Sequence, residues 1–357
     1  MIGKIVHELP PSPENNRNSE GSFITLKNGN ILYIYSRFSN KGWADHAEAD
    51  LYGILSEDGG ESFGSPFPVL CHTQIGASNI MSVSLLRMQN GDIGMFFLAK
   101  NGTTLLRCYL IRSPDEGKTW LPPVLCSNNE GYHVVNNDRV LRCDTGRLLI
   151  PASLHDTQII SEKTHYAPGK LTVFASDDDG FTWKALSGGL TVPVSRGCTT
   201  GAQEPGLVQL KDGSLWCFIR TNAGRQYETF SHDSGETWTQ PQPSPFTSPE
   251  APLSMKRLRD GRLLAVWNPI PLYNGRILAG RSSTWARTPL VMAVSTDDGA
   301  SFSQPIPLET DPDSSYCYTA IHETDDGALL LAYCAGSTQD ACTLNRLRIR
   351  KIPLTEL

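Results

Sequence analysis

Hydrophobic and polar positions alternate in short blocks along the whole of this 357-residue chain. Apolar runs are interrupted by polar turns that centre on a glycine, as in the segments LKNGNILYIY and LRDGRLLAVW. Asn-Gly and Asp-Gly between apolar runs are the strongest short-range signals for a β-hairpin, because glycine readily adopts the positive φ of a tight turn. Turns of this kind centre on Gly29, Gly91, Gly146, Gly213, Gly261 and Gly327. The pattern therefore predicts six hairpins and an all-β chain.

A second pattern repeats between these hairpins. It is the octet Ser-x-Asp-x-Gly-x-Ser/Thr-aromatic, and its five copies begin at Ser56, Ser113, Ser176, Ser231 and Ser295. The Asp carboxylate can accept hydrogen bonds from backbone N–H groups of a turn, and the aromatic ring can cover the base of the hairpin. Because the octet recurs along the chain whereas an active site occurs once, we interpret its Asp residues as structural rather than catalytic.

Both repeats have a period of about 60 residues, which is the size of one four-stranded blade of a β-propeller. Six such units fill the chain, so the sequence predicts a six-bladed β-propeller that forms a single domain over residues 1–357. The runs at residues 31–35 and 329–333 are almost entirely apolar, as expected for strands covered on both faces by neighbouring blades. Residues 4–9 are expected to pair with the strands of the last unit.

Composition argues against several classes of function. The net charge is −6 and no run of basic residues occurs, so we expect no nucleic-acid partner. No apolar stretch has the length of a membrane span, and the N-terminal segment lacks the apolar core of a signal peptide. The nine cysteines form no CxxC pair, and we expect a cytoplasmic protein with reduced thiols. The dispersed histidines and turn glycines indicate no metal and no cofactor. Composition gives no oligomeric state.

A propeller carries its functional groups at one mouth of the central channel, so candidate residues should be polar and specific to one unit. Glu204 precedes an apolar run and Arg220 ends the next one, where each charge needs a partner. The other candidates lie in the segment with Arg37, Asp45 and His46, in the segment with Asp138 and Arg139, and at Arg287 and Tyr318. Structural alternatives remain open: a solvated loop for the first segment, an Asx-type loop for the second, an ion pair for Glu204 and Arg220, and a core position for Tyr318.

On these motifs the chain resembles the sialidase (neuraminidase) superfamily, whose members carry BNR repeats, or Asp boxes, on a six-bladed β-propeller. The octets match the Asp boxes, and the resemblance covers nearly the whole chain. It implies an exo-glycoside hydrolase that removes a terminal acidic sugar with retention, so the expected partner is an anionic carbohydrate. The alternatives are a glycosidase of different sugar specificity and a non-catalytic propeller that binds a glycan or a protein.

The resemblance also implies roles for individual residues. Tyr318, in the segment CYTAI, resembles the nucleophile, Glu204 resembles its base partner, and Asp45 resembles the acid/base. A neutral Tyr nucleophile avoids the repulsion that a carboxylate would meet at a sugar whose anomeric carbon itself carries a carboxylate. Arg220 and Arg287 resemble arginines that bind this carboxylate, and Arg37 resembles the family's second arginine near the pocket. The further substrate-binding candidates are His46, Asp138 and Arg139.

One segment departs from the family. Sialidases begin the first blade with Phe/Tyr-Arg-Ile-Pro, whereas this chain has the segment NSEGSF at residues 18–23, with Ser19 at the arginine position. Arg17 and Glu20 are therefore the candidate substrate-binding residues of the first unit. The departure implies weaker binding of a sugar carboxylate, or a different acidic or neutral sugar.

Overall fold

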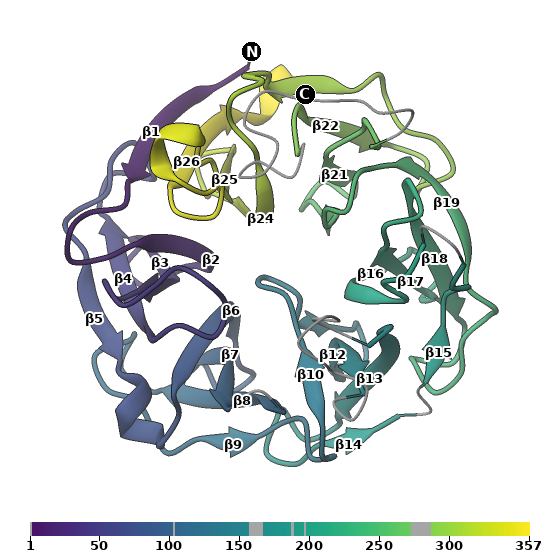
Figure 1. Ribbon diagram of the computed structural model, residues 1–357, viewed down its shortest axis with the longest axis horizontal. Helices are drawn as coiled ribbons and strands as arrows, with labels where there is room; N and C mark the ends of the chain where they lie inside the picture. The colour runs from purple at the N-terminus through teal and green to yellow at the C-terminus, as the bar shows by residue number, and fades with distance from the viewer. Residues whose placement is uncertain (1, 103, 157–166, 187–188, 196–197, 273–286) are drawn as a thin grey trace.

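The structure is a computed structural model that describes residues 2–102, 104–156, 167–186, 189–195, 198–272 and 287–357. Within these ranges the chain is all-β, as the hydrophobic pattern predicted. The strands form five hydrogen-bonded sheets that lie around a common centre (Figure 1). None of the helices in the described ranges is long and apolar enough to cross a membrane.

Three of the sheets are antiparallel and formed by four consecutive strands each. The first contains β2 (Arg17–Thr25), β3 (Ile31–Phe38), β4 (Ala49–Ser56) and β5 (Phe67–Leu70). The second contains β16 (Gln203–Gln209), β17 (Leu215–Arg220), β18 (Arg225–Ser231) and β19 (Gln242–Thr247). The third contains β20 (Ser254–Arg257), β21 (Leu263–Trp267), β22 (Leu290–Ser295) and β23 (Ile306–Glu309).

The fourth sheet joins the two ends of the chain. It contains β24 (Cys317–Glu323), β25 (Ala328–Cys334), β26 (Leu347–Pro353) and β1 (Lys4–Leu9), in the order β1-β26-β25-β24. The pairing of β1 with β26 runs from Lys4 opposite Lys351 to Leu9 opposite Leu347. The expectation that residues 4–9 pair with the last unit is confirmed.

The remaining sheet has ten strands, where the repeat predicted two separate units. Its strands are β6 (Asn79–Arg87), β7 (Ile93–Asn101), β8 (Leu105–Ser113), β9 (Val124–Leu125), β10 (Tyr132–Val134), β11 (Leu141–Arg142), β12 (Leu148–His155), β13 (Lys170–Ser176), β14 (Lys184–Ala185) and β15 (Leu190–Thr191). The three-residue strand β10 is antiparallel to β12 and meets β8 in a parallel bridge between Tyr132 and Leu106. This bridge connects the second and third predicted units, which the repeat treated as separate.

The octets form the local hydrogen-bonded turns that their sequence predicted. In the first octet, Asp58 accepts hydrogen bonds from the Ser62 backbone N–H at 2.9 Å and the Ser62 hydroxyl at 2.5 Å. The Gly60 N–H donates to the Ser56 hydroxyl at 2.8 Å. The same contacts recur at Asp115, Asp178, Asp233 and Asp297.

Hydrophobic clusters fill the space between neighbouring sheets. One cluster contains Tyr33 and Tyr35 of β3 together with Leu330 and Ala332 of β25, so it spans the first and last sheets of the chain. All residues of β25 are buried, and so are all but Arg37 in β3. Burial on both faces explains why these strands are almost entirely apolar. The short 3₁₀ helices are η1 (His72–Ile75), η2 (Thr338–Asp340) and η3 (Leu354–Glu356).

Candidate functional site

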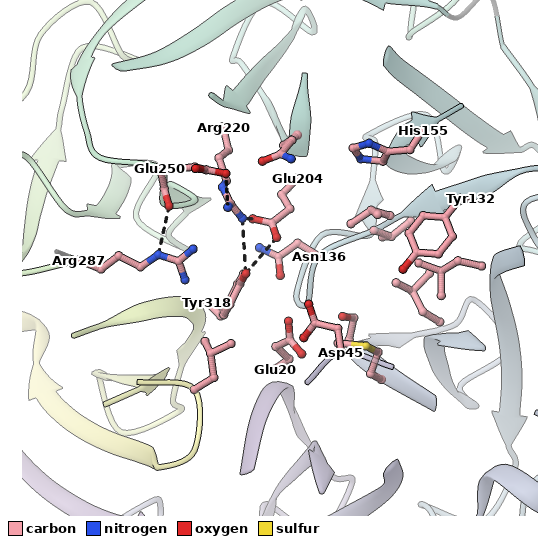
Figure 2. Close-up of a pocket in the computed structure, with 18 of the residues that line it drawn as sticks. Glu20, Asp45, Tyr132, Asn136, His155, Glu204, Arg220, Glu250, Arg287 and Tyr318 are labelled. Atoms are coloured by element: carbon pink, nitrogen blue, oxygen red, sulfur yellow. Dashed lines mark hydrogen bonds and ion pairs between the residues drawn. The ribbon is translucent and has the colours of Figure 1, made fainter. Parts of the chain in front are cut away.

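A cavity of about 420 Å³ lies where the inner strands of several sheets converge (Figure 2). Its wall includes residues of β2, β6, β10, β16, β17 and β24, which are far apart along the chain. This volume lies within the usual range for small-molecule sites. One side of the cavity carries carboxyl, guanidinium and phenol groups, and the opposite side is largely apolar.

The polar residues reach the cavity from equivalent irregular positions of the inner strands. Residues with positive φ occur at Glu20, Ser82, Asp138, Glu204 and Tyr318, with φ of 57°, 60°, 55°, 40° and 59°. The strand pairing shifts register around Glu20, Ser82, Glu204 and Tyr318, and all of these line the cavity. A β-bulge redirects a side chain, and a left-handed backbone at a non-glycine residue costs about 1 kcal/mol or more. The fold therefore holds these residues in a strained conformation that directs them inward.

Tyr318 and Glu204 form the central contact of the cavity. The Tyr318 hydroxyl donates to Glu204 Oε1 at 3.1 Å, and Arg220 Nη1 donates to Glu204 Oε2 at 2.5 Å (Figure 2). Burial and the neighbouring Glu204 raise the pKa of Tyr318 well above its usual value, against the opposing effect of Arg287 and Arg220. The phenol therefore keeps its proton at neutral pH, and Glu204 is in position to accept that proton when the oxygen reacts.

Two arginines flank this pair. Arg220 Nη2 donates to Glu250 Oε1 at 3.1 Å, so Arg220 lies between two glutamates. Arg287 is 5% exposed, and its Nε donates to the Glu250 backbone carbonyl at 3.1 Å. The Arg287 guanidinium also lies 5.5 Å from the centre of the Tyr318 ring. Both guanidinium groups are therefore held rigidly at the cavity wall, close to the phenol.

A second charged group lies on the other side of Tyr318. Arg17 Nη1 donates to Asp45 Oδ1 at 2.6 Å, and Arg17 Nη2 donates to Glu20 Oε2 at 3.0 Å. Burial raises the pKa of Glu20 to about 8 against the opposing effect of Arg17, with further increases from Asp45 and Glu204. The enclosing protein opposes ionisation of Asp45, although its side chain is 49% exposed, and Arg17 outweighs this effect, so the Asp45 pKa is lowered. The pKa values of the two carboxyl groups are thus shifted in opposite directions.

Two amide side chains at the cavity have unused hydrogen-bonding atoms. Asn136 Nδ2 and Gln203 Oε1 are buried and have no hydrogen-bond partner in the part of the chain that the structure describes. Asn136 is 2% exposed, and Figure 2 shows it between Glu204 and Asp45. An unpaired buried polar atom is costly, so these atoms are available to a polar ligand.

The opposite wall is apolar. It is formed by Met81, Leu98, Leu106, Val134 and Val135. Tyr132 and His155 complete this side of the cavity (Figure 2). A ligand that binds here presents hydroxyl or charged groups toward Tyr318 and Arg220 and an apolar face or substituent toward this wall.

The structure brings together Asp45, Glu20, Glu204, Arg220, Arg287 and Tyr318, all of which line the cavity. Arg17 does not line the cavity but contacts it through Asp45 and Glu20. These residues therefore lie together at one cavity, and their chemical roles stay predictions.

Four other expected residues are not among those that line the cavity. The Arg37 guanidinium lies 4.5 Å from the centre of the Tyr52 ring, because alternation along β3 turns it to the opposite face from Ser36. His46 is exposed on a loop. Asp138 accepts from the Ser22 hydroxyl at 2.9 Å and the Ile321 N–H at 3.0 Å, and Arg139 donates to the Leu253 carbonyl at 2.7 Å. Asp138 and Arg139 therefore link inner strands to one another.

Asn136 and Gln203 lie in candidate segments of the sequence, residues 136–139 and 203–206, but neither residue was assigned a role of its own from the sequence. Glu250 lies in no candidate segment of the sequence. Glu250 lies in a Pro-rich connection, and its local sequence gives no indication that it reaches Arg220.

One group of potential metal ligands occurs in the described part of the chain, outside the cavity. Ligand atoms of Asp50, Cys71 and His72 lie within 4.8 Å of one another. Asp50 Oδ1 accepts from His72 Nδ1 at 2.7 Å and from the His72 backbone N–H at 2.8 Å. Asp50 and His72 are therefore already paired with each other, and Cys71 Sγ lies 3.1 Å from the Thr73 hydroxyl.

Comparison with known proteins gives a consistent picture of the fold. The BNR repeat-like domain family matches residues 78–331. No curated protein sequence matches the chain. Among solved structures, a protein of unknown function from Dyadobacter fermentans is 18% identical, with a TM-score of 0.72 over 98% of this chain and 99% of that one.

Two sialidase structures are similarly related. The intramolecular trans-sialidase from Ruminococcus gnavus, solved with oseltamivir carboxylate, is 15% identical, with a TM-score of 0.70 over 99% of this chain and 98% of that one. The leech intramolecular trans-sialidase is 15% identical, with a TM-score of 0.72 over 100% of this chain and 71% of that one. Because these sequences are only 15% identical to this chain, their similarity shows a shared fold and nothing about activity.

Proposed function

Because the chain belongs to the BNR repeat-like domain family, we propose that it is a sialidase-type exo-glycoside hydrolase that removes a terminal acidic sugar with retention of configuration. The observation that carries this proposal is the hydrogen bond of 3.1 Å between the Tyr318 hydroxyl and Glu204, with Arg220 bound to the same carboxylate. A buried phenol paired with a base at a cavity wall is the arrangement that an activated Tyr nucleophile requires.

We also propose that the five sheets represent six blades of one propeller domain. The ten-stranded sheet divides into β6–β9 and β10–β15 at the junction of β8 and β10, which is a bridge of one residue pair. Each part then carries one hairpin glycine, Gly91 or Gly146, and one octet, like the units formed by β2–β5, β16–β19 and β20–β23. The regular spacing of hairpins and octets supports this division.

In the first chemical step, the Tyr318 oxygen attacks the anomeric carbon while its proton passes to Glu204. The glycosidic bond breaks, and the leaving oxygen takes a proton from the carboxyl pair of Asp45 and Glu20. In the second step, water attacks the same carbon and gives a proton to this carboxyl pair. Tyr318 leaves the sugar and recovers its proton from Glu204. Two inversions give net retention.

The substrate carboxylate is bound by Arg220 and Arg287 in this proposal. Guanidinium groups bind a carboxylate through two parallel N–H···O bonds, and both arginines lie next to Tyr318. The neutral phenol can approach an anomeric carbon that carries a carboxylate without charge repulsion. Asn136 and Gln203 supply further hydrogen bonds to sugar hydroxyl groups through their unpaired atoms.

Hydrolysis of an aryl sialoside tests the proposal. Wild-type protein should release the phenol, and Tyr318→Phe should lose about 10³-fold or more in kcat while it keeps the native fold. Tyr333→Phe is a matched control, because the buried Tyr333 hydroxyl also donates to a glutamate, Glu309, at 2.7 Å but lies outside the cavity wall. Full activity of Tyr318→Phe would contradict the mechanism.

A second candidate is a glycosidase for a sugar without a carboxylate. Two observations favour it: Ser19 occupies the position of the first-blade arginine, and the acidic Glu20 lines the cavity next to it. Parallel assays with aryl glycosides of neutral sugars distinguish the candidates. Faster hydrolysis of a neutral glycoside than of the sialoside would favour this second function. Binding of a glycan without hydrolysis would favour a non-catalytic role.

A further inference from the structure

Two carboxyl groups share one guanidinium at the cavity. Arg17 is fully buried, and its two terminal nitrogens donate separately to Asp45 and Glu20. The remaining nitrogen of Arg17 donates to the Ser19 hydroxyl at 2.8 Å, and the guanidinium lies 4.4 Å from the centre of the Phe38 ring. Arg17 therefore cannot turn away from either carboxyl group without losing several contacts.

One positive charge cannot fully compensate two carboxylates in a buried site, so one of the two carboxyl groups retains a proton. The surroundings of Asp45 and Glu20 determine which of the two carboxyl groups keeps the proton. The side chain of Asp45 is 49% exposed and has the shorter contact to Arg17, at 2.6 Å. The side chain of Glu20 is 6% exposed, with a contact of 3.0 Å. Water and Arg17 together stabilise the Asp45 carboxylate, and Glu20 is the group that holds the proton.

The other charged and titratable groups around the pair reinforce this difference. Those acting on Glu20 are Arg17, Asp45, Glu204 and Cys317, with Cys334 facing it as well. Lys100 donates to the Asp45 backbone carbonyl at 3.3 Å and favours the Asp45 carboxylate. Most groups near Glu20 are thus acidic, whereas those near Asp45 include two cations in addition to Arg220.

Glu20 also has the position that a proton donor needs. It lies at the bulge of β2, equivalent to the bulges of β16 and β24 that direct Glu204 and Tyr318 into the cavity. Figure 2 shows Glu20 beside Asp45, on the side of Tyr318 away from Arg220. A leaving group placed there is separated from the arginines that bind the sugar carboxylate in the proposed reaction.

We propose that Glu20 is the residue that protonates the leaving oxygen, with Asp45 acting as a positioning residue that holds Arg17. This inference rests on the proposed glycoside hydrolase function. When the glycosidic bond breaks, the Glu20 proton passes to the leaving oxygen and Glu20 becomes a carboxylate paired with Arg17. In the second step the attacking water gives its proton to Glu20, while Tyr318 leaves the sugar and recovers its proton from Glu204.

Infrared titration tests the location of the proton without any substrate. Protein grown with glutamate labelled with ¹³C at the side-chain carboxyl should show a shifted protonated-carboxyl band at neutral pH, which disappears as the pH rises through about 8. Glu20→Gln should remove this band, whereas Asp45→Asn should keep it at neutral pH and lower its titration midpoint. Glu228→Gln is the control, because burial also raises the pKa of Glu228, outside the cavity wall.

Leaving-group dependence tests the donor role. With methyl sialoside, whose alcohol needs a proton to leave, Glu20→Gln should lose about 10²–10³-fold in kcat. With 4-nitrophenyl sialoside, whose phenolate leaves unaided, the same variant should lose less than about tenfold, because general-acid assistance is then small. For wild-type protein, kcat/KM on methyl sialoside should fall as the pH rises through about 8. Asp45→Asn should affect both substrates to a similar extent.

The outcomes separate the two proposals. If wild-type protein lacks the labelled band, Glu20 is not the proton donor, even if hydrolysis occurs. The same conclusion follows if the band survives in the double variant that carries both Glu20→Gln and Glu228→Gln. The wild-type spectrum is informative even if Glu20→Gln does not fold. Equal losses on both sialosides in Glu20→Gln would also overturn the donor role. Wild-type protein that hydrolyses neither sialoside would overturn the proposed hydrolase, and the donor role with it.

Discussion

At the scale of single residues, the site depends on side chains that strained backbone positions direct into one cavity. Glu204 and Tyr318 have φ of 40° and 59°, values that non-glycine residues adopt at an energetic cost. The hydrogen-bonded strands on either side supply the stability that keeps these positions in place. The backbone strain therefore occurs at Glu204 and Tyr318, the residues that we propose as base and nucleophile.

Substitution of the two glutamates that bind Arg220 separates catalysis from positioning. Glu204→Gln should lower kcat on an aryl sialoside by about 10²–10³-fold, because the Tyr318 proton then has no acceptor. Glu250→Gln should cost about tenfold or less, because Glu250 contacts Arg220 and its side chain is 41% exposed. Steady-state kinetics of both variants give the comparison, and a larger loss for Glu250→Gln would contradict the assignment of Glu204.

The sequence was informative for residues that stand in motifs and uninformative for contacts that only the fold creates. Glu204 and Tyr318 were predictable because each occurs in a recognisable segment next to an apolar strand. Asp138 was expected at the cavity, but its carboxylate accepts hydrogen bonds from Ser22 and Ile321, which are remote in sequence. The orientation of the Asp138 side chain depends on these distant partners, so the sequence around Asp138 could not predict that it does not line the cavity.

At the scale of elements, the octet turns are stabilised by one carboxylate each. The hydrogen bond from the Ser62 hydroxyl lowers the pKa of Asp58 to about 2, against the opposing effect of burial and with support from the Ser62 N–H and the Ser56 hydroxyl. A carboxylate of this kind contributes stability above its unfolded-state pKa of 3.8 and loses that contribution as the pH falls toward 2.

Asp58→Ala should lower the free energy of unfolding by about 1 kcal/mol at neutral pH, since hydrogen bonds of an exposed carboxylate are partly replaced by water. The difference from wild type should disappear as the pH falls from about 4 to 2, because Asp58 is then protonated in both states. Urea unfolding at several pH values measures this. Glu57→Ala is the control in the same turn, and an equal effect there would contradict the role of Asp58.

Hairpins and octets were predictable from sequence because each depends on local turn chemistry. The pairing of β10 could not be predicted from sequence, because this strand has three residues and its parallel contact with β8 is a single residue pair. Such a short strand has no alternating pattern of apolar and polar residues, and the surrounding structure determines which strands it pairs with. The predicted separation of the second and third units differed from the observed hydrogen bonding for this reason.

At the scale of the whole molecule, Lys351 links the last sheet to the first octet. Its side chain is 6% exposed, and its ammonium group donates to Gly59 O at 2.8 Å, Glu61 Oε1 at 3.0 Å and Asp326 Oδ2 at 2.7 Å. Pairing of β1 with β26 joins the two ends of the chain in the same region. The contacts of Lys351 with Gly59 and Glu61 connect segments that are 292 and 290 positions apart in the sequence.

Lys351→Ala should destabilise the protein by about 1–3 kcal/mol, because two carboxylates and a carbonyl lose a buried cationic donor. Lys4→Ala is the matched control: Lys4 also contacts Glu61, but its side chain is 63% exposed. An exposed ion pair contributes about 0–1 kcal/mol. Chemical unfolding of the two variants measures the difference, and equal effects would show that Lys351 does not stabilise this junction.

The central claim is that Tyr318 and Glu204, 114 positions apart, act together as a nucleophile and its base. Incubation with a fluorinated sialosyl fluoride, followed by peptide mass spectrometry, tests this claim most directly, because the fluorine slows release of a covalent glycosyl-enzyme. The account predicts one sugar attached to the peptide that contains Tyr318, and no label in Tyr318→Phe. Sugar attached to another residue, or turnover of sialosides with no label on Tyr318, would contradict it.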